Sequence, residues 1–350
     1  MPTPGGTRRS RRLRFALTGH VMRRLPAGVL RSMARRGAEK GGSPPPFADF
    51  VTFLEALGPA ADRMLANPEE VDLVGQFPEL AQVAVRPLRL GPAEVPARVY
   101  RHPAPSAGSA LVWVHGGAYV SGSLDMHESH WVALSLAARG IPVLALDYRK
   151  ALHGVRYPVP RDDVMAGWRW AVEHSAEAFG VAPDALHLGG GSAGGNLAAS
   201  VTRRLIEEGA PAPRSLVLAY ATVHARVAEW DPAALAAVQA ATHGACFALD
   251  WIEDKNTHYA GLTNTRDPAV FPGEGDPLDG HPPTLFLNCE NDTARPSAER
   301  FARQLDEAGV PHETHLLKGE AHGSLDRPTT SGGQEALDHM TEWLVRPRPW

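Results

Sequence analysis

From about residue 84 onward, short apolar segments alternate with amphipathic ones, and this alternation limits the chain to few folds. The apolar segments, which we expect to form strands, lie at 85–90, 95–100, 110–114, 142–148, 185–189, 215–221, 284–289 and 312–317. Helical spacing of apolar residues marks 127–139, 162–179, 193–208, 297–308 and 334–345. We therefore predict an α/β fold, with a mostly parallel eight-stranded sheet and helices on both faces. In such sheets functional residues collect at the carboxyl ends of the strands.

Two regions depart from the alternation. Residues 1–83 precede the main strand series and are expected to form a basic arm and a helical cap, joined by a Gly-Gly-Ser-Pro-Pro-Pro linker at 41–46. Residues 224–283 are too long for a simple connection and contain no clear strand. We predict that they form a lid inserted into the domain of residues 84–350, carrying Trp230, Phe247, Trp251 and Tyr259.

Charge and composition exclude several classes of protein. A net charge of −4 gives no general attraction to nucleic acid, although residues 1–40 carry +10 and the remainder −14. No apolar stretch approaches 18 residues, so we expect no integral membrane span. Two cysteines, Cys246 and Cys289, are too few for a disulfide framework or a cysteine zinc site. The pair Arg11-Arg12 only faintly suggests twin-arginine export, and we expect a cytoplasmic location. A homodimer is left open.

A Gly-x-Ser-x-Gly motif centred on Ser192 lies between a predicted strand and a predicted helix. Glycines on both sides of a serine allow a tight turn that presents its hydroxyl above the sheet, at a helix N-terminus. The same residues also spell the dinucleotide fingerprint Gly-x-Gly-x-x-Gly, starting at Gly189. That motif should follow the first strand of its unit and have a carboxylate after the next strand, and neither condition is met.

The sequence His115-Gly-Gly-Ala-Tyr follows the predicted strand at 110–114. Without side chains, Gly116 and Gly117 can aim backbone N–H groups at one point, and the N–H of Ala193 could join them. We therefore predict an oxyanion hole made by these three amides. Read alone, the glycine pair would equally well mark a tight turn.

A serine needs a neighbouring base to act as a nucleophile. Of the sixteen histidines, His322 follows the last predicted strand, whereas His315 and His339 fall within a strand and a helix. Asp292 follows the preceding strand and is the expected acid, with Glu290 as a substitute and a helix N-cap as its alternative role. The chain order Ser192, Asp292, His322 is the order expected of an α/β hydrolase.

Taken together, these motifs, with Asp147-Tyr148-Arg149 and Gly-Ser-Ala-Gly-Gly-Asn at 191–196, resemble the hormone-sensitive-lipase-like family of bacterial esterases. The resemblance covers residues 84–345 within the α/β-hydrolase superfamily. It implies Ser192 as nucleophile, His322 as base and Asp292 as acid, with neither a metal nor a cofactor. Tyr119 and Gly191 are expected to contact the substrate.

The chain departs from the family pattern at four places near the expected site. Gly191 stands where the family usually has aspartate, Ala118 stands where a third glycine is common, and Ser324 replaces an aromatic residue. The family's acidic residues downstream of Asp292 are missing.

The leading interpretation is a serine carboxylic ester hydrolase that acts through an acyl-serine on small to medium acyl esters. An acyltransferase or cyclising biosynthetic enzyme could use the same intermediate. A ligand-binding protein on the same fold is the other alternative, although such proteins tend to lose the catalytic histidine, which is present here.

Overall fold

The computed structural model describes residues 45–58, 61, 71–104, 106–242 and 246–347. The basic segment at 1–40, with its arginine pair, lies outside the described residues.

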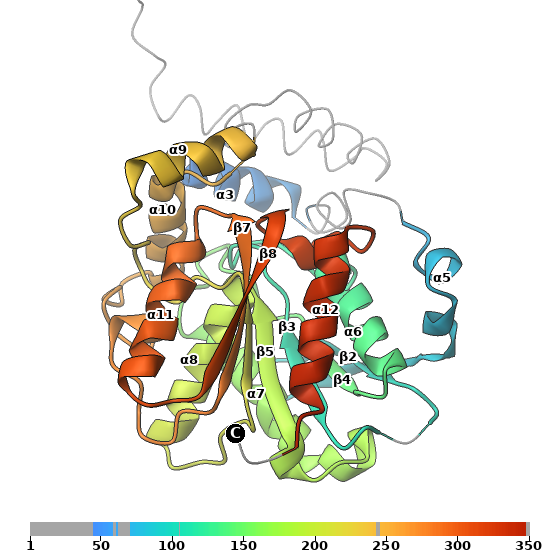
Figure 1. Cartoon of the computed structure of the whole chain (residues 1–350). Helices are drawn as coiled ribbons and strands as arrows, with labels where there is room; N and C mark the ends of the chain where they lie inside the picture. The colour runs from blue at the N-terminus through green and yellow to red at the C-terminus, as the bar shows by residue number, and fades with distance from the viewer. Residues whose placement is uncertain (1–44, 59–60, 62–70, 105, 243–245, 348–350) are drawn as a thin grey trace, which may run out of the picture.

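All eight predicted strands are present in one sheet (Figure 1). They are β1 (Ala84–Leu90), β2 (Val95–Arg101), β3 (Ala110–Val114), β4 (Val143–Leu146), β5 (Leu186–Gly191), β6 (Leu216–Ala219), β7 (Thr284–Asn291) and β8 (His312–Ala321). Their order is β1-β2-β4-β3-β5-β6-β7-β8. The β1–β2 and β2–β4 pairs are antiparallel, and the pairs from β4 to β8 are parallel. The predicted mostly parallel sheet is confirmed.

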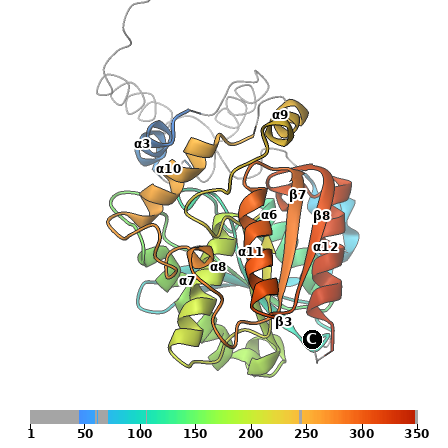
Figure 2. The same ribbon diagram turned by 60° about the vertical axis from the view of Figure 1, so that its left-hand side comes forward.

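Helices cover both faces of the sheet, as predicted (Figures 1 and 2). One face packs against α6 (His127–Ala138) and α12 (Ser331–Leu344), and the other against α7 (Val159–Glu173), α8 (Ala193–Glu207) and α11 (Arg295–Glu307). Successive residues of a strand point to opposite faces. In the fully buried strand β3, Val112 therefore belongs to the core on the α7–α8 side, whereas Trp113 belongs to the core on the α6–α12 side.

Three further helices lie above the carboxyl ends of the parallel strands (Figures 1 and 2). They are α3 (Phe47–Leu57), α9 (Pro232–Ala241) and α10 (Leu249–Ala260). The ring of Phe47 in α3 meets Trp251 in α10 edge-on, with 5.0 Å between centroids. The indole N–H of Trp251 also donates to the carbonyl of Pro45 at 3.1 Å. Segments distant in the sequence, α3 and the segment from α9 to α10, thus share one layer at the carboxyl edge of the sheet, which we call the cap.

Shorter helices and turns lie between these strands and helices. The helix α5 (Leu73–Gln76) precedes the sheet, 3-10 turns lie at Pro78–Gln82, Pro183–Ala185, Pro272–Glu274 and Ser324–Asp326, and a π turn lies at Ser175–Phe179. The helix predicted at 162–179 is therefore divided, because α7 ends at Glu173 and the π turn follows. In its described part, the segment 224–283 contains α9 and α10 and no strand, as expected.

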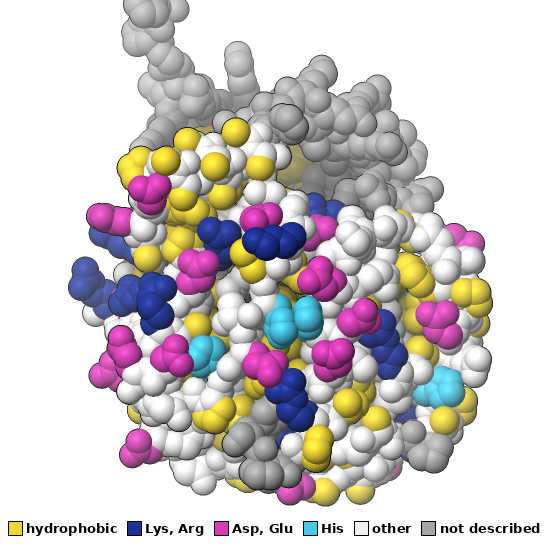
Figure 3. Space-filling view, viewed as in Figure 1, with side chains coloured by type: hydrophobic (Ala, Val, Ile, Leu, Met, Phe, Trp, Pro, Cys, Tyr) yellow, Lys and Arg dark blue, Asp and Glu magenta, His cyan; other side chains and the backbone are white. Residues whose placement is uncertain are grey.

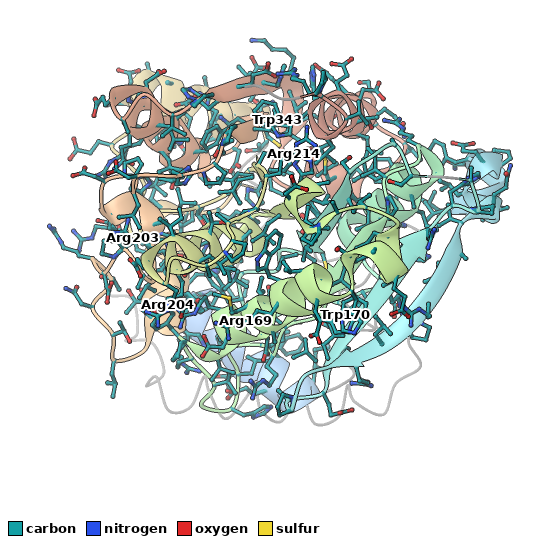
Figure 4. All side chains as sticks on the ribbon, turned by 90° about the horizontal axis from the view of Figure 1, so that it is seen from below. Arg169, Trp170, Arg203, Arg204, Arg214 and Trp343 are labelled. Atoms are coloured by element: carbon teal, nitrogen blue, oxygen red, sulfur yellow. The ribbon has the colours of Figure 1, made fainter. Side chains whose placement is uncertain are left out.

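Polar contacts also lie at the opposite end of the molecule, which Figure 4 shows from below. Arg169 of α7 and Arg204 of α8 both pair with Glu208, at 3.1 Å and 2.7 Å. The indole N–H of Trp343 in α12 donates to the Ser215 hydroxyl at 2.8 Å. These groups lie at the amino ends of the parallel strands, away from the motifs described above.

Charged side chains of both signs are mixed on the face shown in Figure 3, and hydrophobic side chains gather over α9. None of the helices in the described part of the chain has the length and apolar character needed to cross a bilayer. The two cysteines are both free; Cys289 is buried and Cys246 is partly exposed.

Candidate active site

Ser192 occupies the sharp turn between β5 and α8. Its backbone has φ 50° and ψ −117°, which is unusual for a residue with a side chain, and it directly precedes the first residue of α8. The turn requires close backbone approach: a Cβ on Gly194 would lie 2.1 Å from the carbonyl oxygen of Val114, and one on Gly190 would lie 2.5 Å from it. The two glycines of the motif are therefore needed for this geometry, and they place the serine hydroxyl at the carboxyl edge of the sheet.

The imidazole of His322 lies between Ser192 and Asp292. The Ser192 hydroxyl is 2.9 Å from His322 Nε2, and His322 Nδ1 is 2.7 Å from Asp292 Oδ2. The Asp292 carboxylate is 1% exposed, and its other oxygen accepts the N–H of Ala294 at 2.8 Å. A buried carboxylate held in this way fixes the tautomer and the orientation of the imidazole. Asp292 thus accepts a backbone N–H just before the start of α11, similar to the N-cap role considered for it, and also contacts His322.

The alternative residues are placed elsewhere. Glu290 accepts the backbone N–H of Gly319 at 2.8 Å and pairs with Lys318 at 3.1 Å, so it does not contact His322. His315 and His339 stack on each other with 3.6 Å between ring centroids, on β8 and α12. The structure therefore brings together Ser192, Asp292 and His322 but not these three.

The loop that follows β3 is fixed by the residues after β4. His115 is fully buried; its Nδ1–H donates to the Gly116 carbonyl at 2.7 Å, and its ring stacks on Tyr148. The Tyr148 hydroxyl donates to the same carbonyl at 3.0 Å. Burial opposes ionisation of Asp147, but the adjacent Lys150 ammonium and His115 hold the pKa of that carboxyl below its usual value. The Asp147-Tyr148 motif thus anchors the glycine pair.

The amide of Gly116 departs from its predicted role. Its N–H donates to the Glu128 carboxylate, so in this arrangement it is not available to an oxyanion. The N–H of Gly117 forms no hydrogen bond within the described part of the chain, and Ala193 is the first residue of α8, where an N–H has no acceptor inside the helix. Two of the three predicted oxyanion donors, Gly117 and Ala193, therefore remain available.

Glu128 fills the space beside Gly191. Its carboxylate accepts the Tyr220 hydroxyl at 2.6 Å as well as the Gly116 N–H, and burial raises its pKa. A Cβ at position 191 would lie 2.6 Å from Glu128 Cδ, so any side chain there would require the Glu128 carboxylate to move. Gly191 does not line the cavity next to Ser192, and its contact with the substrate stays a prediction.

A cavity of about 300 Å³ opens next to the Ser192 hydroxyl. Its wall includes Ser192 and His322, and the apolar side chains Phe50, Met126, Phe247, Trp251 and Ile252. Tyr119, which we expected near the mouth, is fully buried, stacks on Tyr259 at 4.0 Å between centroids and does not line the cavity. Ala118, directly after the glycine pair, lines the cavity, whereas Tyr119 packs into the buried core.

Three charged residues near the site escaped the sequence analysis: Glu128, Lys255 and Asp326, all of which line the cavity. Glu128 and Lys255 lie within helices and Asp326 within the 3-10 turn after β8, and none belongs to a motif. A carboxylate in the largely apolar segment 127–139, combined with the missing aspartate at 191, was the available signal for Glu128. For Lys255 no comparable signal exists, because α10 also carries exposed charges.

Comparison with known proteins agrees with this architecture. Residues 111–326 match a family with the α/β-hydrolase fold. The chain is 34% identical over 233 residues to an ethyl acetate hydrolase of Pseudomonas putida, covering 65% of this chain and 70% of that protein. It is 33% identical over 261 residues to the carboxylic ester hydrolase LipN of Mycobacterium tuberculosis, covering 70% of this chain and 65% of LipN, slightly under two thirds.

Solved structures give the same result for the fold. The esterase LipW from Mycobacterium marinum superposes with a TM-score of 0.66 at 26% identity, covering 77% of this chain and 84% of LipW. An esterase from the bacterial hormone-sensitive lipase family superposes with a TM-score of 0.68 at 23% identity, covering 91% of this chain and 97% of that one. The resemblance to esterases of the α/β-hydrolase fold seen in the sequence is confirmed: this chain belongs to the α/β-hydrolase family.

Proposed function

We propose that this enzyme hydrolyses carboxylic esters through a covalent acyl-serine formed on Ser192. The observation that supports this most strongly is the continuous contact from Ser192 through His322 to Asp292, at 2.9 Å and 2.7 Å. In this mechanism His322 Nε2 removes the hydroxyl proton while Ser192 Oγ attacks the ester carbonyl. The buried Asp292 carboxylate stabilises the imidazolium that forms.

The N–H groups of Gly117 and Ala193 are the proposed donors to the tetrahedral oxyanion. Collapse of that intermediate breaks the bond to the alkoxy group, which takes a proton from His322 and leaves as the alcohol. Water then gives a proton to His322, attacks the acyl-serine and releases the acid, and the proton returns to Ser192. The role of Glu128 is to hold Gly116, which precedes the donor amide of Gly117.

The proposed substrates are esters with small to medium acyl groups. A cavity of about 300 Å³ lies at the small end of the range of ligand pockets. Cap residues Phe50, Phe247 and Trp251 narrow it with aromatic rings. A cytoplasmic location and the division into arm, cap and catalytic domain remain predictions from the sequence, and a homodimer remains open.

The test is a panel of p-nitrophenyl esters from C2 to C12, run on wild type, Ser192→Ala and His322→Ala. We expect turnover of the shorter chains, falling toward C12, and loss of about 10³-fold or more in kcat for both variants. Added methanol separates acyl transfer from hydrolysis by the methyl ester it would yield. No turnover by the wild type, or full activity of Ser192→Ala, would contradict the proposal.

A further inference from the structure

Lys255 places a buried ammonium group at the wall of the cavity next to Ser192. It lies in α10, its residue is 4% exposed, and it lines the same cavity as Ser192 and His322. Lysine is among the residues least often buried, because removing an ammonium from water costs several kcal/mol unless a partner compensates for it. The contacts of Lys255 should therefore show which partner it has.

The protein gives this ammonium only partial compensation. Nζ donates to the Thr222 hydroxyl at 2.9 Å and lies 5.4 Å from the centroid of the Tyr119 ring. Within the described residues no carboxylate lies within 4 Å of it. An ammonium has three N–H donors, so two lack a protein acceptor in the described part of the chain. Burial lowers the pKa of Lys255 to about 7, although the charge of Asp292 opposes this.

A purely structural role explains little of this placement. The cap helix α10 is already joined to the loop after β6 by Asn256, whose side-chain amide donates to the carbonyls of His224 and Ala225. Trp251 and Tyr259, one turn before and one turn after Lys255, pack against aromatic rings. An apolar side chain at 255 would complete this buried face at a lower cost in free energy, whereas the structure has an ionisable amine there.

The other charges at the cavity wall already have partners. Glu128 accepts from Gly116 and Tyr220, and Asp326 accepts the backbone N–H of Glu128 at 3.1 Å. Both carboxylates come from α6 and the segment after β8, whereas Lys255 comes from the cap helix. An anionic group entering the cavity would therefore be repelled on one side and find unused donors at Lys255.

We propose that Lys255 binds a carboxylate of the substrate, so that the preferred esters carry an anionic group a few atoms from the ester bond. This inference rests on the proposed esterase function. A carboxylate offers acceptors for the two unused N–H donors, and a charge-assisted hydrogen bond in a water-poor cavity is stronger than a neutral one. Monoesters of short dicarboxylic acids and acyl esters of short hydroxy acids both present this group.

The test compares substrates in which a carboxylate is replaced by an isopropyl group of similar shape. Ethyl hydrogen succinate is paired with ethyl 4-methylpentanoate for the acyl side, and 3-acetoxypropanoate with 3-methylbutyl acetate for the alcohol side. The variants are Lys255→Met and Lys255→Arg, and Lys318→Met is the matched control, because Lys318 is exposed and pairs with Glu290. The readout is the ratio of kcat/KM for the charged and neutral member of each pair.

We expect Lys255→Met to lower this ratio about 10- to 100-fold for one of the two pairs, mainly through KM, as for loss of one charged hydrogen bond. Lys255→Arg should recover part of the ratio, and Lys318→Met should leave it unchanged. The responding pair shows whether the carboxylate lies on the acyl or the alcohol side. An unchanged ratio in Lys255→Met for both pairs, with wild type active on the neutral esters, would overturn this inference alone. Inactivity of wild type on all four esters and on the p-nitrophenyl panel would instead overturn the esterase proposal.

Discussion

The carboxylate of Glu128 occupies the space in which a side chain at position 191 would lie. A Cβ on Gly191 would be 2.6 Å from Glu128 Cδ, and the same carboxylate holds the Gly116 N–H. The family usually has an acidic residue immediately before the nucleophile. This chain has a glycine there, and a carboxylate from α6 lies in its place.

Because the Glu128 carboxylate lies where a side chain at position 191 would be, we predict that mutations at positions 128 and 191 have coupled effects. Glu128→Ala should lower kcat about 10- to 100-fold, because the Gly116–Gly117 loop loses its anchor. Gly191→Asp alone should destabilise the protein through the steric conflict. The double variant Glu128→Ala/Gly191→Asp should recover part of the lost kcat, measured with a C4 ester. Simple additivity of the two single effects would contradict this relationship.

The orientation of His322 by Asp292 predicts a large effect of an uncharged replacement. Asp292→Asn should lower kcat by about 10³-fold or more at neutral pH, because the imidazolium loses its buried counter-charge. Glu290→Gln is the matched control, since Glu290 contacts Lys318 and Gly319 instead. Steady-state kinetics on both variants distinguishes the two carboxylates, and equal losses would contradict the assignment.

The aromatic residues that line the cavity predict a preference for esters with short acyl chains. Trp251 stacks on Phe247 with 4.8 Å between centroids and lines the cavity. Trp251→Ala should enlarge the cavity and raise the C8:C4 ratio of kcat/KM several-fold. Leu262→Ala, at a fully exposed position in the same segment, should leave the ratio as in wild type. A ratio that falls or stays constant in Trp251→Ala would place the acyl chain elsewhere.

Acid should weaken the fold through a buried histidine. Burial, aided by the nearby charge of Arg300, lowers the pKa of His224 from 6.5 to about 4. The unfolded chain therefore binds a proton below pH 6.5 that the folded protein resists until about pH 4. The resulting stability is present above pH 6.5 and decreases as pH falls, by up to about 3 kcal/mol.

His224→Gln should remove this dependence. Urea unfolding at pH 7 and pH 4.5 measures the free energy of unfolding for both proteins. The difference between the two pH values should be smaller in the variant by about 2 kcal/mol. His281, whose pKa burial also lowers to about 4, is present in both proteins. An identical pH dependence in wild type and variant would show that His224 does not titrate in this way.

The sheet and the Ser192–Asp292–His322 contacts were predictable because each follows from a local pattern. Strands such as 110–114 are continuous apolar segments, and Ser192 is marked by glycines that only a tight turn explains. Helix ends were less predictable: α7 ends at Glu173 and a π turn follows. Propensity alone does not distinguish such a turn from a continuing helix.

The remaining site residues depend on long-range packing. Glu128 contacts Gly116 and the space beside Gly191 only because the start of α6 packs against the loop after β3. Tyr119 was expected at the cavity but stacks on Tyr259 of the cap, a partner 140 residues away in a segment without motifs. Lys255 likewise becomes part of the cavity only when α10 lies over the sheet.

Reaction with diethyl p-nitrophenyl phosphate tests the central role of Ser192 most directly. Attack by Ser192 Oγ would displace p-nitrophenolate and leave a diethylphosphoryl group on the serine. Peptide mass spectrometry should then find one such group per chain, on the peptide containing Ser192, with loss of esterase activity in parallel and no label in Ser192→Ala. A label on a different residue, or continued ester turnover without any label, would contradict the account.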